Sequence, residues 1–169
     1  MLHCNERNDN SNKDSPLPLL GLLLNSYHLN CSLLNLKMPE ASSKTLQTAE
    51  IAFQAFSHGL AGGDWSPFLD QLTDDFTFWF PAGPFKGLNH GREKAKEFFA
   101  LVSKLFPEGL TLVVQQITSN PTTVVFEVRS QGLMLGHPYE NQVAIAFEVR
   151  DDKICAYREY LGVVFQLGQ

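Results

Sequence analysis

This sequence predicts an α+β domain in which three helices pack on the concave face of a curved, mainly antiparallel sheet. Apolar residues recur at helical spacing in two early segments, and four alternating, β-branched segments then follow one another toward the end of the chain. Helices first and consecutive strands after them are typical of α+β folds. The hydrophobic fraction of 44% is sufficient for one sizeable core.

The first 38 residues differ in composition from the rest. They contain no Phe and only one aromatic residue, Tyr27. A packed domain does not segregate its aromatic side chains in this way, so we interpret 1–38 as a disordered or loosely structured extension and 39–169 as the domain. We also hypothesise that Met38 is the native start, which an intact mass that includes residues 1–37 would contradict.

The helices are predicted from apolar stripes and end signals. A first helix begins at Ser42 or Ser43 and stops at 59–64, where glycines cluster. A short second helix lies within 64–72, with Pro67 in its first turn. A third covers 92–106 and ends before Pro107.

The strands are predicted from β-branched and aromatic runs between turn residues. The segment 76–80 is a short strand, and the Gly- and Pro-rich segment 81–91 is a turn region that includes His90. The remaining predicted strands form a meander over 110–118, 124–135, 139–149 and 154–165, with breaks at 119–122, 136–138 and 150–153.

Two polar residues interrupt apolar faces of the last two strands. Alternation places Glu159 with Cys155 and Tyr157, opposite Ile154, and it places Asn141 on the apolar face of the strand before. Both point into the same interior if an odd number of residues forms the connecting turn.

Each of these two residues has two interpretations. A carboxyl buried without partners has a raised pKa, which suits general acid or base chemistry near neutral pH. Alternatively, Arg158 or Lys153 satisfies Glu159 at the rim of the sheet. Asn141 either fixes backbone at an irregular strand start or presents its amide to a ligand.

Composition excludes several classes of function. The net charge is −5 and the 13 Lys and Arg residues form no basic stripe, which excludes a nucleic-acid binder. Cys4, Cys31 and Cys155 are too far apart for a zinc site or a disulfide framework, so we expect no metal and a reducing cytoplasmic location. No apolar run has the length of a membrane span, and 16–24 does not fit a signal peptide.

The order of elements and several motifs resemble the NTF2-like superfamily, in its SnoaL-like and ketosteroid-isomerase-related branch, over about residues 45–166. Segments 91–109 and 139–160 look most like the phenazine-biosynthesis A/B-type proteins, chiefly through Tyr-x-Asn at 139–141 and Arg-Glu-Tyr at 158–160. The resemblance implies a cone-shaped homodimeric domain with an apolar pocket, in which Glu159 faces the ligand as acid/base.

The chain also departs from these relatives. Phe98 and Val102 replace the histidine and serine that phenazine-type proteins place on the third helix, and Gly162 replaces an acid of many SnoaL-like proteins. The polar groups of ketosteroid isomerases fall at apolar positions here, so the resemblance argues against that mechanism; these positions are Phe56, Phe80 and Ile145.

These residues fit two functions, one enzymatic and one not. The first is a cofactor-independent isomerase, cyclase or condensation catalyst for a small apolar carbonyl compound, in which Glu159 moves a proton and Asn141 orients the carbonyl oxygen. The second is a non-catalytic ligand-binding or assembly module. The predicted ligand-binding residues are Asn141, Trp79, Phe56, Phe98, Phe147 and Tyr157.

We also expect a homodimer. The outer face of the sheet would carry a mixed polar surface able to pair with a twofold copy, formed by Arg158, Tyr160, Gln142 and Glu148.

Overall fold

A computed structural model describes the chain from residue 43 to residue 162. The predicted extension and the hypothesis about Met38 lie outside the described residues. The elements are, in order, α1 (Ser43–Gly62), α2 (Ser66–Leu69), β1 (Leu72–Phe80), a 3-10 turn η2 (Gly83–Phe85), β2 (Gly87–His90), α3 (Arg92–Leu105), β3 (Leu110–Ser119), β4 (Thr123–Met134), β5 (His137–Arg150) and β6 (Lys153–Leu161).

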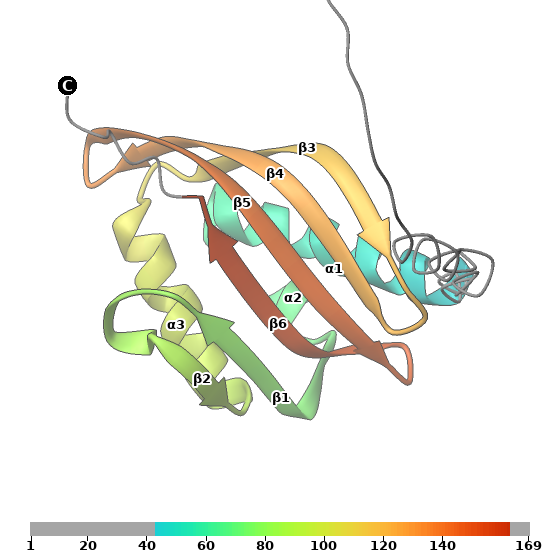
Figure 1. Cartoon of the computed structure of the whole chain (residues 1–169). Coiled ribbons are helices and arrows are strands. Elements are labelled where there is room, and N and C mark those ends of the chain that lie inside the picture. Colours follow the sequence, from blue (N-terminus) through green and yellow to red (C-terminus); the bar gives the residue numbers. More distant parts are fainter. Residues whose placement is uncertain (1–42, 163–169) are drawn as a thin grey trace, which may run out of the picture. The chain divides into compact units, whose positions relative to one another are not determined.

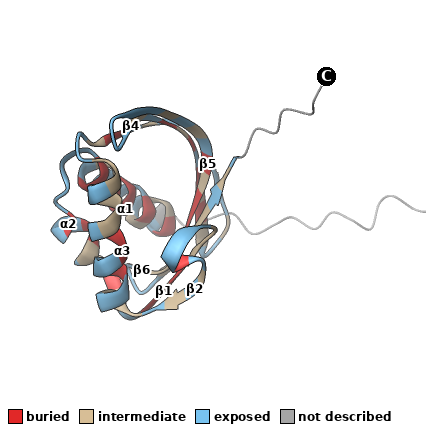
Figure 2. Cartoon of the chain, turned by 90° about the vertical axis from the view of Figure 1, so that its left-hand side faces the viewer, coloured by how far each residue is buried: buried red, intermediate tan, exposed pale blue. Residues whose placement is uncertain are grey.

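The six strands form one curved sheet in the order β2-β1-β6-β5-β4-β3. All neighbouring pairs are antiparallel except β1 and β6, which are parallel because the chain crosses back from one side of the sheet to the other. The three α-helices lie on one face of the sheet, and the strands bend around them (Figures 1 and 2). The predicted α+β class is confirmed.

The helices follow their sequence signals. After α1, Gly63 adopts a positive φ of 79° and donates its N–H to the Gly59 carbonyl, which ends the helix. Asp64 Oδ1 accepts a hydrogen bond from the Ser66 N–H at the start of α2. No helix within 43–162 combines the length and the apolar character that a membrane crossing requires.

The segment 81–91 contains more regular structure than the sequence predicts. Residues 87–90 form strand β2, and His90 is its last residue, paired with Thr77 of β1. The prediction of a simple turn region was wrong because β2 exists through its pairing with β1. Four residues that begin with Gly87 and are followed by Gly91 carry no strand pattern of their own.

The connection between β4 and β5 is tighter than predicted. Met134 pairs with His137, so the turn is only Leu135 and Gly136, both with positive φ. The predicted break at 136–138 was therefore too long. Pro138 lies inside β5, opposite Leu133, near the end of the hairpin.

The turn between β5 and β6 corrects the parity argument. Only Asp151 and Asp152 form it, an even number, and both adopt positive φ. A β-bulge follows at once: Val149 pairs with Ile154, whereas Glu148 pairs with Ala156, so Cys155 is the extra residue. The bulge restores the parity for Asn141 and Glu159, but it also turns Ile154 inward, where it is fully buried, contrary to the predicted face.

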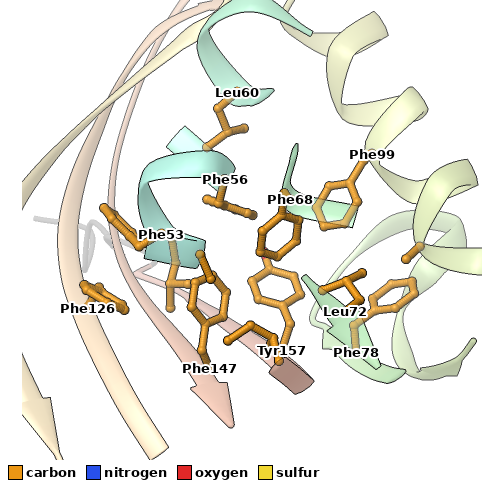
Figure 3. Close-up of a cluster of buried hydrophobic side chains, with 14 of the residues drawn as sticks. Phe53, Phe56, Leu60, Phe68, Leu72, Phe78, Phe99, Phe126, Phe147 and Tyr157 are labelled. Carbon is orange, nitrogen blue, oxygen red and sulfur yellow. The ribbon is translucent and has the colours of Figure 1, made fainter. Parts of the chain in front are cut away.

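The core between helices and sheet is predominantly aromatic (Figure 3). Phe56 of α1 contacts the rings of Phe68, Phe147 and Tyr157 at centroid distances between 5.3 and 5.9 Å. Gly59 makes room for Trp65, because a Cβ at Gly59 would lie 2.5 Å from that ring. Edge-to-face and offset contacts of this kind fill the helix side of the sheet.

Candidate functional site

A cavity of about 260 Å³ lies between the helices and the inner face of the sheet. Aromatic and aliphatic side chains dominate its walls. Its lining residues are Phe56, Leu60, Trp65, Phe80, Ala82, Gly83, Pro84, Phe85, Phe98, Phe99, Leu101, Val102, Leu105, Phe106, Leu110, Leu112, Ser130, Met134, Tyr139, Val143, Ile145, Tyr157, Glu159 and Leu161. For comparison, a dry cavity of about 150 Å³ accommodates benzene, so this one has room for a larger organic molecule.

Glu159 lines this cavity, and it is the only acidic or basic side chain among the lining residues. It pairs with Ile145 of β5, so its side chain shares the inward face of the sheet with that buried isoleucine. Glu159 is half-buried, as expected for a side chain in the wall of a cavity. Removal from bulk water raises the pKa of Glu159 from its ordinary value near 4.5 to about 8. The carboxyl is thus mostly protonated at neutral pH.

Tyr157 contacts Glu159 from the same face of β6. Its hydroxyl donates a hydrogen bond to Oε2 of Glu159. The Tyr157 ring is fully buried and packs near Phe56, Phe147 and Phe99. A hydroxyl can donate to a carboxylate or accept from a carboxylic acid, and the bond to the charged carboxylate is the stronger of the two.

A second polar cluster lies on β4 and β5 and consists of Ser130, Tyr139 and Asn141. Ser130 and Tyr139 line the cavity. The Asn141 side chain donates through Nδ2 to the Tyr139 hydroxyl oxygen at 3.3 Å, and the Ser130 hydroxyl donates to the Asn141 backbone carbonyl at 3.3 Å. Ser130 is not among the predicted site residues, although it interrupts the alternating apolar face of β4 just as Asn141 interrupts that of β5.

The structure brings together four of the predicted site residues, since Phe56, Phe98, Tyr157 and Glu159 all line the cavity. Two other predicted residues do not line the cavity. Phe147 is fully buried within the aromatic core and is not part of the cavity lining. Asn141 is half-buried and is not part of the lining either, although its amide donates to the hydroxyl of Tyr139, which is.

Trp79 lies on the outer face of the sheet, which corrects its predicted place in the pocket. Alternation along β1 turns Phe78 and Phe80 inward and Trp79 outward. There its ring stacks on Tyr160, with ring centroids 5.3 Å apart. An aromatic residue in a strand with aromatic neighbours on both sides carries no signal for its face.

Metal-binding residues do not gather in the described part of the chain. Between residues 43 and 162, no three His, Cys, Asp or Glu side chains lie close enough together to hold a metal ion. Cys155 lies at the bulge of β6, where its Sγ contacts the Glu148 carbonyl, and burial raises its thiol pKa.

Comparison with known proteins gives a family match and several similar structures. A model of the SnoaL-like domain matches residues 53–157, a range that ends two residues before Glu159. The crystal structure of an NTF2-like protein from Anabaena variabilis is 55% identical; the match covers 75% of this chain and 96% of that chain, with a TM-score of 0.72. A search of curated proteins finds no significant match.

More distant structures share the fold. A putative SnoaL-like polyketide cyclase from Jannaschia is 22% identical over 72% of this chain and 90% of that one, with a TM-score of 0.61. An LEH-like epoxide hydrolase from M. tuberculosis is 19% identical over 69% of this chain and 84% of that one, with a TM-score of 0.55. At these identities the likeness concerns the architecture of helices and sheet.

Proposed function

This chain belongs to the SnoaL-like domain family of NTF2-like proteins, and on that premise we propose that it binds a small, neutral, apolar carbonyl compound and exchanges a proton with it through Glu159. The observation that carries the proposal is the Glu159 carboxyl in the wall of an otherwise apolar cavity. Apolar clefts with a few placed polar groups are typical of small-molecule sites.

The charge of the cavity supports a neutral ligand. Its lining includes no Lys, Arg or His, and its one acid is Glu159. A carboxylate or phosphate would therefore lose its hydration and gain no cationic partner, at a cost of several kcal/mol. A ketone or aldehyde loses much less on transfer, and its oxygen can accept a hydrogen bond from a protonated carboxyl.

The chemistry follows from the position of the Glu159 pKa. With a pKa near 8, Glu159 is mainly an acid at pH 7 and can donate to a carbonyl oxygen. Its minor carboxylate form is a stronger base than an ordinary glutamate, suited to remove a proton from the carbon next to the carbonyl. Returning that proton to a different atom of the same ligand isomerises it. If the resulting enolate instead attacks an electrophilic carbon, a ring or a condensation product forms.

The site gives no support to the ketosteroid isomerase mechanism. Phe56, Phe80 and Ile145 all line the cavity, and their apolar side chains stand where the resemblance places the polar groups of that reaction. In place of those groups, the Tyr157 hydroxyl donates a hydrogen bond to Glu159 and helps to hold its carboxyl in the wall of the cavity. The acid/base role of Glu159 that the likeness of 139–160 to phenazine-biosynthesis proteins implies stays a prediction.

The alternative function is a non-catalytic binding module, in which Glu159 only donates a hydrogen bond to a bound ligand. Proton exchange separates the two functions. The probe is 4-phenylbutan-2-one, an apolar ketone of suitable size, and the full-length protein is used. Its affinity is measured by calorimetry, and the exchange of its α-protons in D₂O is followed by NMR.

We expect the wild type to bind the ketone and to accelerate α-proton exchange, and we expect Glu159→Gln to bind it without accelerating exchange. Glu127→Gln is the matched control, because Glu127 is exposed and does not line the cavity. Binding without any exchange would favour the binding module. Exchange that persists in Glu159→Gln would remove Glu159 from the mechanism.

A further inference from the structure

We infer that the cavity has a second polar subsite, formed by Tyr139 and Ser130, that binds a hydroxyl group at the end of the ligand far from Glu159. The ligand is then an elongated apolar molecule with a reacting carbonyl at one end and an alcohol or phenol at the other. The assignment of the carbonyl end rests on the proposed function of Glu159, whereas the subsite itself rests on a separate set of contacts.

Strand register places the two polar groups at different ends of the cavity. Glu159 of β6 lies beside Ile145 of β5, and Ser130 of β4 lies beside Asn141 of β5. These two positions on β5 are four residues apart, which is about 13 Å along an extended strand. The wall between them is apolar, since Val143 and Leu161 occupy the intervening lining positions.

Ser130 and Tyr139 are close neighbours on the inner face. Tyr139 pairs with Gly132 across the hairpin, so Ser130 is the diagonal neighbour of Tyr139, and both side chains line the cavity. The Tyr139 ring is held edge-to-face by Phe106 of the cavity wall, with centroids 5.1 Å apart. This contact fixes the direction in which the Tyr139 hydroxyl points.

The hydrogen bonds leave one donor and one acceptor for a ligand. The Tyr139 oxygen accepts from Asn141 Nδ2, so its own proton can go to a ligand acceptor. The Ser130 hydroxyl uses its proton on the Asn141 carbonyl, so its lone pairs can accept from a ligand donor. A hydroxyl group both accepts and donates, and it therefore matches this pair.

The packing of Ser130 points the same way. Ser130 is only 2% exposed, and the bond from its hydroxyl to the Asn141 carbonyl, at 3.3 Å, is longer than a good hydroxyl bond. A buried hydroxyl that is only weakly satisfied is costly unless it gains a further partner. No charged side chain lines this end, which favours a neutral hydroxyl over an anion. Asn141 is a positioning residue here, since it acts through Tyr139.

The test compares two probes that differ by one hydroxyl, 4-(4-hydroxyphenyl)butan-2-one and 4-phenylbutan-2-one, with calorimetric dissociation constants on the full-length protein. We expect the phenol to bind the wild type roughly five- to tenfold more tightly, the gain from one or two net hydrogen bonds. Tyr139→Phe and Ser130→Ala should each reduce that ratio toward one, because they weaken the binding of the phenol more than that of the phenyl probe.

Two further variants separate this inference from the proposed function. Asn141→Ala should reduce the same ratio, because the Tyr139 hydroxyl is no longer oriented, and Glu159→Gln should leave the ratio unchanged because it affects both probes alike. Equal binding of the two probes to the wild type, with α-proton exchange that still depends on Glu159, would overturn the second subsite alone. A preference for the phenol without such exchange would overturn the catalytic proposal alone, and failure of both probes to bind would overturn both.

Discussion

Tyr157 and Glu159 share the inward face of β6, and the Tyr157 hydroxyl donates a hydrogen bond to the Glu159 carboxyl in the wall of the cavity. Both side chains line the cavity, but the tyrosine is fully buried among aromatic rings, whereas the glutamate is only half-buried. Tyr157, which is fixed by packing, therefore orients Glu159, which has free space beside it in the cavity. Such support is what a placed acid needs in a cavity that offers few other polar contacts.

The first prediction concerns this hydrogen bond. Donation from Tyr157 favours the charged form of Glu159, so Tyr157→Phe should raise the pKa of Glu159 further above its ordinary value. The measurement is an NMR titration of the ¹³C-labelled carboxyl, with Glu159→Gln to assign the signal. A lowered or unchanged pKa in Tyr157→Phe would contradict the role given to the hydroxyl.

The second prediction concerns stability and pH. Because the pKa of Glu159 is raised to about 8 in the folded chain from about 4.5, the folded state keeps a proton that the unfolded chain has lost between these values. Stability should therefore fall as the pH rises through that window. Glu159→Gln lacks this effect, so its free energy of unfolding should improve relative to wild type by about 1–3 kcal/mol between pH 5 and pH 8.

Urea unfolding at several pH values measures this difference, and Glu127→Gln is the control. Glu127 is exposed on β4, so its variant should follow the wild type throughout. A constant offset between Glu159→Gln and wild type would mean that Glu159 titrates normally.

The third prediction concerns the aromatic core. Phe147 is fully buried and contacts the rings of Phe53, Phe68 and Phe126. Phe147→Ala should lower the free energy of unfolding by about 3–5 kcal/mol, through lost burial and an unfilled hole. Ile51→Ala is the contrast, since Ile51 is 52% exposed, and it should change stability by only about 0.5 kcal/mol. A small loss of stability in Phe147→Ala would contradict this prediction and would show that neighbouring side chains repack into the space of the removed ring.

The fourth prediction concerns the proposed homodimer. Leu88, Trp79 and Tyr160 adjoin one another on the outer face of the sheet, where Leu88 is 60% and Tyr160 is 49% exposed. The Arg158–Glu148 ion pair at 3.2 Å is formed by neighbouring outward residues. An exposed apolar patch that is bordered by polar residues is suited to a twofold interface.

We expect a dimeric mass by light scattering at micromolar concentration and a monomeric mass for Tyr160→Glu, which would bury a charge in that interface. Ile51→Glu, on α1, is the control and should stay dimeric. A monomeric wild type would contradict the proposal.

Register illustrates how far the sequence predicts the site. Alternation correctly placed Asn141 and Glu159 on one face. The expectation of a turn with an odd number of residues was wrong, because the turn has two residues and the bulge at Cys155 restores the parity. Bulges depend on pairing with the neighbouring strand, and β6 pairs with both β5 and β1. No local pattern announces them.

The sequence by itself determined the helix stripes, most strands, the α+β class and the two polar interruptions at Asn141 and Glu159. These depend on periodicity, which every residue carries locally. The tertiary structure decided what each polar group meets. It placed Tyr157 against Glu159, turned the Asn141 amide to Tyr139, moved Trp79 to the outer face and added Ser130 to the cavity. The Trp79–Tyr160 contact joins strands that are far apart in the chain. The pairs Tyr157–Glu159 and Tyr139–Asn141 are each two residues apart on one strand, and only the packing of helices on the sheet places them at a cavity.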